Sequence, residues 1–291
     1  MTQRFTTAEL AEMRAFYEKH GALHIPGLID PAKAQEILDF ADQMAAQADE
    51  PIPAGSPVSY GRGVGRMTIR YLWKDKPLIN EFLLDGDLGR TVAGIIGAKQ
   101  LRFWFDLTFM HNGANDGGAG EGTAWHHDIA AFGFKGDQLP SLWMALTSAT
   151  LDNSRLEFID GSHKTVPGYY RPPTTNPTAW DGYLEIPDFD AKLASGEEKI
   201  LGWDCAPGDA LLIHPYTIHG ARGNAGGKTG GRRVAITTRW LGDDVRWLPT
   251  NGQSPTLPGL KESNLAVGGR PDGEWFPLVH DETAPALSAA A

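Results

Sequence analysis

The stretch "LRFWFDLTFMH", residues 101–111, opens a part of the chain in which aromatic and β-branched residues dominate. Gly, Pro, Asn and Asp separate the later segments of this kind: "SLWMALTSAT" (141–150), "RLEFID" (155–160), "DALLIHPYTIHG" (209–220) and "RRVAITTRWL" (232–241). Short strand-forming runs between turn residues are typical of an antiparallel sandwich or barrel. We therefore expect a mainly β fold from Gln100 onward.

The residues before this part predict a layer of helices that packs on the sheet. Thr6 and Glu9 have the spacing of a capping box, and Gly21 follows where that first helix would end. The pair Asp30–Pro31 supplies the N-cap and first position of a second helix. The other elements expected here are a strand at "ALHIPGLI" (22–29), a loop at 51–66, a strand at "MTIRYLW" (67–73) and helical pieces over 76–97.

Composition narrows the class of protein. The 291 residues, 41% of them hydrophobic, suffice for one large domain, which we expect to span residues 1–283, with a disordered tail at 284–291. A net charge of −10 argues against nucleic acid as a partner. Cys205 is the only cysteine, and the sequence shows neither a signal-peptide pattern nor a membrane-spanning apolar run. These features predict a soluble, cytoplasmic protein without membrane contact, and they leave the oligomeric state open.

The motif "TAWHHDIAAFG", residues 123–133, carries the candidate chemistry. On an extended segment side chains alternate, so His126 and Asp128 point one way and His127 the other. An imidazole and a carboxylate two residues apart can bind one metal ion, and a third ligand is expected from another strand. The candidates for that ligand are His111, His163, His214 and His219.

His214 and His219 lie five residues apart, which is opposite parity on a strand, so at most one of them can face the metal. His219 precedes a Gly at the end of its run. The simplest alternative roles are a hydrogen-bonding residue for His127, a core residue for His214 and an exposed turn residue for His163. Two histidines and one carboxylate form the ligand set of non-haem Fe(II) oxygenases, which makes metal redox chemistry the leading hypothesis.

Several motifs in order resemble the phytanoyl-CoA dioxygenase family of Fe(II)- and 2-oxoglutarate-dependent oxygenases. They are "WHHD" (125–128), "LWMALTSATLDNSRLEFIDGSHK" (142–164), "APGDALLIHPYTIHGARGN" (206–224) and "GRRVAITTRW" (231–240), preceded by "EKHGALHIPGLIDPAKA" (18–34). The resemblance implies a double-stranded β-helix, a cupin-like jelly roll whose mouth holds the iron. It also implies a metal triad of His126, Asp128 and His219, with Fe(II), 2-oxoglutarate and O2 as cofactor and cosubstrates.

The distal carboxylate of 2-oxoglutarate needs a buried partner, for which a two-pronged guanidinium is best suited. Strand parity puts Arg233 and Arg239 on one face and Arg232 on the other. The position of Arg233 before "VAI" resembles that of the family's arginine, so Arg233 is our candidate. Trp143 resembles an aromatic residue that lines the cosubstrate pocket in this family, and a core tryptophan is the alternative.

The sequence departs from the family pattern at three places. Asn153, Ser154 and Arg155 stand where Asn-Gly often precedes the Leu, Asp160 stands where Pro is common, and Ala221 replaces a Ser beside the distal His-Gly. None of these departures touches the triad. They put the turn geometry and the surroundings of the cosubstrate in question.

The implied reaction is hydroxylation of a C–H bond in a small organic substrate, with release of succinate and CO2. Asp128 disfavours halogenation, since related halogenases replace this carboxylate, whereas desaturation and ring formation stay open. Two long connections, 52–66 and 171–199, are candidate lids. Their aromatic residues suit an organic or quaternary ammonium substrate, whereas the neighbouring Arg66 and Arg70 suit a carboxylate or phosphonate; the aromatic residues are Tyr60, Tyr169, Tyr170, Trp180 and Tyr183. A cupin-like dioxygenase that does not use 2-oxoglutarate and a catalytically silent binding protein are the alternative functions.

Overall fold

The fold comes from a computed structural model of the whole chain. It describes residues 4–63, 65–111, 122–172, 180, 182–223, 231–249 and 265–283. The expected disordered tail, 284–291, lies outside the described residues, and the domain boundary at residue 283 therefore stays a prediction.

The first two helices begin where local signals predict. Thr6 caps the first helix with a complete capping box to Glu9, and Gly21 ends it with φ 79° in the left-handed region. Asp30 caps the second helix, whose first residue is Pro31. The helices are α1 (Thr7–His20), α2 (Pro31–Ala46), α3 (Leu72–Asp75), α4 (Pro77–Leu83), α5 (Gly86–Ile96) and α6 (Phe189–Ser195).

The strands form two antiparallel sheets that face each other, and a small two-stranded pair. The large sheet has the order β1-β10-β7-β12-β4-β3-β2, with β14 beside β4, and the smaller sheet has the order β5-β11-β8-β9. The strands are β1 (Ala22–Ile25), β2 (Ser59–Gly63), β3 (Arg66–Arg70), β4 (Gln100–His111), β5 (Thr123–His126), β6 (Phe134–Lys135), β7 (Ser141–Ala145), β8 (Leu156–Ile159), β9 (Ile200–Gly202), β10 (Ala210–Ile213), β11 (His219–Ala221), β12 (Arg233–Leu241), β13 (Arg246–Trp247) and β14 (Leu278–Asp281).

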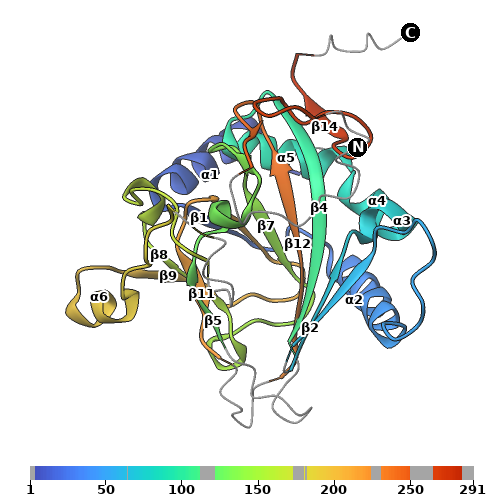
Figure 1. The fold of residues 1–291 in the computed structure, drawn as a ribbon, viewed down its shortest axis with the longest axis horizontal. Coiled ribbons are helices and arrows are strands. Elements are labelled where there is room, and N and C mark those ends of the chain that lie inside the picture. The colour runs from blue at the N-terminus through green and yellow to red at the C-terminus, as the bar shows by residue number, and fades with distance from the viewer. Residues whose placement is uncertain are drawn as a thin grey trace.

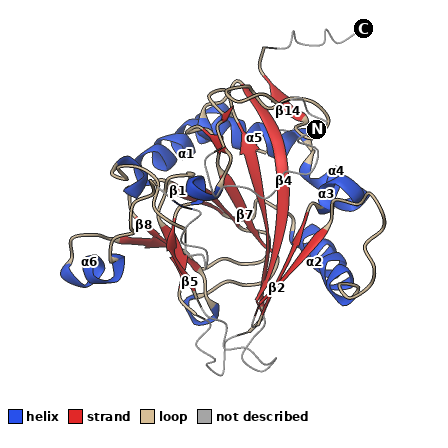
Figure 2. Cartoon of the chain, viewed as in Figure 1, coloured by secondary structure: helices blue, strands red, loops and turns tan. Residues whose placement is uncertain are grey.

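The two faces of the large sheet have different partners (Figure 1). On β12, Val234 and Ile236 belong to the core shared with the helices, whereas Ala235 packs toward the smaller sheet. Figure 2 shows the helices α1, α2 and α5 on the outer side of the large sheet and α6 beside the smaller sheet. This arrangement confirms the predicted jelly roll with an N-terminal helical layer.

Three local expectations were wrong. The second half of the expected loop 51–66 forms β2, which pairs with β3 along its whole length. The expected strand 67–73 ends at Arg70, and Tyr71, with φ 61°, turns the chain into α3. The segment 209–220 is two strands rather than one, because a turn at residues 215–216 leads the chain from β10 in the large sheet to β11 in the smaller sheet.

None of the described helices is both long enough and apolar enough to cross a bilayer.

Candidate active site

Three potential ligand atoms converge where β5 and β11 pair. His126 is the last residue of β5, and its cross-strand partner is His219, the first residue of β11. Asp128 begins a 3₁₀ turn, Asp128–Ala131, directly after β5. The ligand atoms of these three residues all lie within 4.8 Å of one another, which makes them a group able to hold a metal ion.

Backbone contacts orient both imidazoles in the same way. The Nδ1 of His126 lies 2.8 Å from the carbonyl oxygen of Ala124, and the Nδ1 of His219 lies 2.9 Å from that of Thr217. Since a carbonyl only accepts, each Nδ1 carries the proton, and each Nε2 keeps a free lone pair. Both Nε2 atoms lie 3.9 Å from Oδ1 of Asp128, too far for a hydrogen bond, so the three donors face a common gap that suits an ion.

The two carboxylate oxygens of Asp128 have different partners. Oδ1 faces the histidines, whereas Oδ2 accepts a hydrogen bond of 2.6 Å from Ser141 and lies 3.2 Å from a guanidinium nitrogen of Arg239. Burial raises the pKa of Asp128, but Arg239, the two histidines and Ser141 outweigh it and hold the pKa well below its usual range. Asp128 is therefore an anion with one carboxylate oxygen free to bind a metal ion.

Burial, followed by the neighbouring His126, lowers the pKa of His219 to about 4. The ring is thus neutral at physiological pH, as a metal ligand must be. The donor set is two neutral imidazole nitrogens and one carboxylate oxygen, which fits Fe(II) with positions left open for other ligands.

The other histidines lie elsewhere. His127 is buried and its Nε2 accepts the backbone N–H of Tyr170, while His214 accepts the N–H of Tyr216. His163 is half-buried rather than exposed, and its ring lies 4.8 Å from that of His214. His111 lines the same cavity as the triad but is not part of the ligand group.

Strand parity predicted correctly that His127 points away from His126 and Asp128, but the segment is not extended over all three residues. The strand β5 ends at His126, and Asp128 reaches the site from a 3₁₀ turn rather than from an extended segment. Lys135 holds this turn, because its buried ammonium donates to the carbonyls of Ile129 and Phe132 at 2.8 and 2.6 Å.

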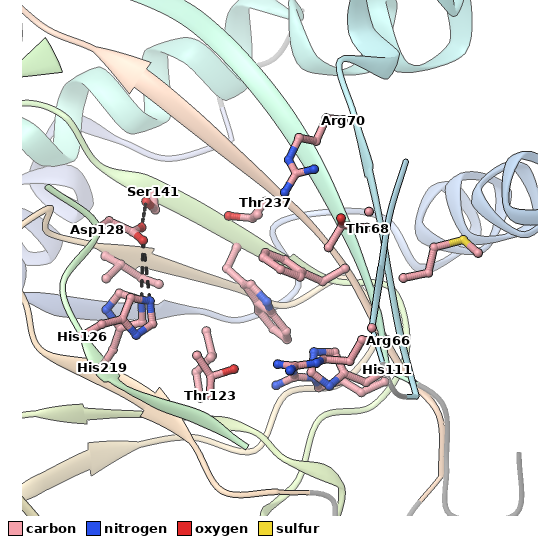
Figure 3. A pocket seen from close by; sticks show the side chains of 18 of the residues that line it. Arg66, Thr68, Arg70, His111, Thr123, His126, Asp128, Ser141, His219 and Thr237 are labelled. Atoms are coloured by element: carbon pink, nitrogen blue, oxygen red, sulfur yellow. Dashed lines mark hydrogen bonds and ion pairs between the residues drawn. The ribbon is translucent and has the colours of Figure 1, made fainter. Parts of the chain in front are cut away.

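A cavity of about 390 Å³ lies between the sheets and contains the triad. Figure 3 shows His126, Asp128 and His219 gathered at one side, with Arg66 and His111 on the opposite side. The wall also includes Arg70, Phe109, Ser141, Trp143, Arg233, Thr237 and Arg239.

Arg233 has the surroundings of an anion-binding residue. It is 4% exposed, it donates to the carbonyl of Ser154, and no carboxylate in the described part of the chain pairs with it. Burial lowers the pKa of its guanidinium to about 10, which leaves it charged. Arg232, on the opposite face of the chain, forms a two-pronged ion pair with Asp42.

The residues that depart from the family pattern lie in defined surroundings. Ser154 adopts φ 73° and ψ 47°, a left-handed conformation that favours glycine, and its carbonyl contacts Arg233. Asp160 pairs with His20 at 2.6 Å, which ties the turn after β8 to the end of α1. Ala221 pairs with Leu156 in the smaller sheet.

His24, Cys205 and Asp209 form a second group with metal-ligating side chains. The oxygens of Asp209 already accept the backbone N–H groups of Gly27 and Ala206, and one lies 3.1 Å from His24. The hydrogen bonds of Asp209 therefore connect the start of β10 to the end of β1, which is a structural role.

Comparison with known proteins gives the family. Residues 17–234 match the family model described as phytanoyl-CoA dioxygenase. The chain belongs to this family. Membership makes it one of the Fe(II)- and 2-oxoglutarate-dependent oxygenases. A similar protein of Caenorhabditis elegans, named a probable phytanoyl-CoA dioxygenase, is 25% identical over 246 residues, 81% of this chain and 76% of the other.

Solved structures share the fold at low identity. The epimerase SnoN from nogalamycin biosynthesis, described as non-haem and α-ketoglutarate dependent, is 20% identical and has a TM-score of 0.72, with 94% of this chain and 100% of SnoN covered. EctD from S. alaskensis, solved with 2-oxoglutarate and 5-hydroxyectoine, is 14% identical and has a TM-score of 0.65, with 90% of this chain and 86% of the EctD chain covered. Both likenesses concern the fold.

Sequence reasoning missed the role of Ser141 and Lys135, which hold Asp128 and its turn. The pairing of β7 with β12 places Ser141 opposite Arg239, and this register is not written in either segment alone. Arg239 carried a usable signal, because its parity with Arg233 puts it on the cavity face.

Proposed function

We propose that the protein is a dioxygenase that hydroxylates a C–H bond of a small organic substrate. One O2 and one 2-oxoglutarate are consumed, one oxygen atom enters the substrate as a hydroxyl group, and the other enters succinate as CO2 leaves. His126, Asp128 and His219 bind the iron, and Arg233 binds the distal carboxylate of 2-oxoglutarate. Iron with 2-oxoglutarate and O2 supplies the oxidant that attacks the C–H bond.

The observation that carries the proposal is the combination of two features in one cavity. Three ligand atoms converge at one side, and a buried guanidinium without a carboxylate partner in the described chain lies in the same wall. An unpaired buried cation is costly, and a bound dianion removes that cost. Trp143, 4% exposed, forms part of the wall on the neighbouring strand and is proposed to pack against 2-oxoglutarate.

The chain's own residues have distinct tasks in this scheme. The carbonyls of Ala124 and Thr217 keep the Nδ1 protons in place, so that each Nε2 stays free for iron. Ser141 and Arg239 bind one oxygen of Asp128 and leave the other for the metal.

The cavity wall is basic, which bears on the ligands it accepts. Arg66 and Arg70 line it, and within the described chain neither has an ion-pair partner. Of the described aromatic residues expected to cover a substrate, none lines this cavity; Tyr169 stacks on Tyr216, and Tyr170 packs against His127. This wall favours negatively charged ligands, 2-oxoglutarate among them, over a quaternary ammonium group.

What the similar proteins bind supports a small-molecule substrate. SnoN was solved with Fe³⁺, α-ketoglutarate and nogalamycin RO, and EctD with 2-oxoglutarate and 5-hydroxyectoine. The net charge of −10 supports the same choice over nucleic acid. We also propose a cytoplasmic location, because a chain with a single cysteine can form no internal disulfide and fits a reducing compartment.

The test is anaerobic addition of Fe(II) and 2-oxoglutarate, followed by visible spectroscopy. We expect the weak charge-transfer band of iron chelated by a 2-oxo acid. The band is absent for a cupin-like dioxygenase that does not use 2-oxoglutarate and for a silent protein that binds no iron. If no band forms while iron binds, the cosubstrate assignment is wrong.

A further inference from the structure

The residues on either side of His126 form hydrogen bonds with a part of the chain that lies far away in the sequence. Trp125 and His127 flank His126, and both side chains point away from the gap between the ligands. The part they meet comprises residues 166–172 and 182–193, here called the outer segment. It packs beside the smaller sheet, where α6 lies in Figure 1.

Three hydrogen bonds join the outer segment to residues 125–131, which carry His126 and Asp128 and are here called the metal-binding turn. The backbone N–H of Tyr170 donates to Nε2 of His127 at 2.9 Å, and the indole N–H of Trp125 donates to Asp190 at 3.0 Å. The hydroxyl of Tyr183 donates to the carbonyl of Ala130 at 3.3 Å. The contacts fall before, between and after the two ligands of this turn, so they constrain it on both sides.

The contact through His127 is well shielded. His127 is 2% exposed, and its ring centroid lies 5.4 Å from that of Tyr170 and 6.3 Å from that of Tyr216. The backbone of the outer segment is fixed in turn, because the backbone N–H of Arg171 donates to the carbonyl of Leu184 at 2.8 Å and that of Leu184 donates to the carbonyl of Tyr169 at 2.8 Å. This buried hydrogen bond to a fixed backbone restricts the movement of the His127 ring. It therefore also restricts the backbone between His126 and Asp128.

We propose that the outer segment sets the position of the metal-binding turn, with His127 and Trp125 as positioning residues for His126 and Asp128. The inference rests on the proposed function, since it assigns these residues a task in iron binding. Neither residue touches the metal. Their loss moves the ligands, and partners that orient metal ligands typically change metal affinity by about 10- to 100-fold.

The test compares two replacements of His127. Gln keeps an acceptor that can receive the N–H of Tyr170, whereas Leu has a similar size and no acceptor. We expect His127→Leu to weaken Fe(II) binding about tenfold or more under anaerobic conditions, and His127→Gln to restore most of it. Trp125→Phe, which removes only the N–H donor and part of the ring, is the independent second variant, and a loss of affinity is expected there as well.

The control separates positioning from general destabilisation. Asn80→Leu removes a hydrogen bond of 3.0 Å to the carbonyl of Trp73, far from the site in the fold, and its melting temperature gives the effect of destabilisation alone. We expect it to bind Fe(II) like the parent protein. The charge-transfer band with 2-oxoglutarate is recorded for every variant, because it reports the iron environment without turnover.

The outcomes distinguish this inference from the proposed function. If the parent protein gives no band, the proposed function fails. If the parent gives the band while His127→Leu and Trp125→Phe bind Fe(II) with parental affinity and parental spectra, the positioning role is wrong and the proposed function stands. Equal losses in the Leu and Gln variants also overturn the role, because the acceptor then has no effect.

Discussion

Truncation of Arg233 to Ala removes the proposed partner of the distal carboxylate of 2-oxoglutarate. The guanidinium is 4% exposed and has no carboxylate partner in the described chain, so the ligand meets it in a desolvated pocket. Leaving such a charge unpaired costs about 2–5 kcal/mol. At tenfold per 1.4 kcal/mol this is roughly 30- to 3000-fold in 2-oxoglutarate affinity.

The assay is an anaerobic titration of the Fe(II)-loaded protein with 2-oxoglutarate, followed by the charge-transfer band. Iron affinity should stay at the parental value, because Arg233 is outside the ligand group. Arg233→Lys should recover only part of the loss, since an ammonium lacks the two-pronged donor geometry.

Arg232→Ala is the matched control. Its guanidinium pairs with Asp42 at a half-exposed site on the opposite face, where an ion pair is worth about 0–1 kcal/mol. We expect parental 2-oxoglutarate affinity. A loss in the Arg232 variant with none in the Arg233 variant would show that the cosubstrate lies on the other face, and no loss in either would refute the 2-oxoglutarate site.

Three further predictions concern the triad and the core beneath it. Asp128→Ala should abolish substrate hydroxylation in a folded protein, since only two neutral ligands remain; near-parental iron-dependent 2-oxoglutarate turnover would exclude Asp128 as a ligand. Ser141→Ala removes the 2.6 Å hydrogen bond to Asp128 and should weaken Fe(II) binding by about 10- to 100-fold, measured by anaerobic titration; parental affinity would contradict this. Burial raises the pKa of Asp106 to about 7, so its contribution to stability is present at low pH and is lost as the pH rises from about 4 to 7. Relative to Asp106→Asn, the parent should therefore lose unfolding free energy over that range in denaturant titrations, and a pH-independent difference would count against a buried, titrating carboxyl.

The first two helices were predictable because their start signals are local, whereas α3 falls in an expected strand and α6 in an expected connection. The capping box at Thr6 and the Asp30–Pro31 start act within a few residues, and both helices begin as expected. The strand β2 was missed for the opposite reason. Its sequence "SYGRG" contains two glycines and no alternating apolar residues, and it is a strand only because β3 offers it a partner.

The candidate site was predictable to the extent that it depends on residue types and parity. His126, Asp128 and His219 were identified as a set, and the structure brings their ligand atoms together. The partners of Asp128 were not predictable, because Ser141 lies on another strand and meets Asp128 through sheet register. The pairing of strands thus determines which side chains surround Asp128, and the sequence motif that contains Asp128 does not show them.

The strand β12 shows why fold and site depend on each other. Arg233, Thr237 and Arg239 line the cavity, while Val234 and Ile236 are fully buried among the helices on the other face. A shift of one residue in the pairing of β12 would put an arginine into the helix-side core and a valine into the cavity. The apolar packing against the helices therefore fixes the register that holds Arg239 beside Asp128 and Arg233 in the cavity wall. The N-terminal helical layer, which contributes no ligand, is in this way a condition for the geometry of the site.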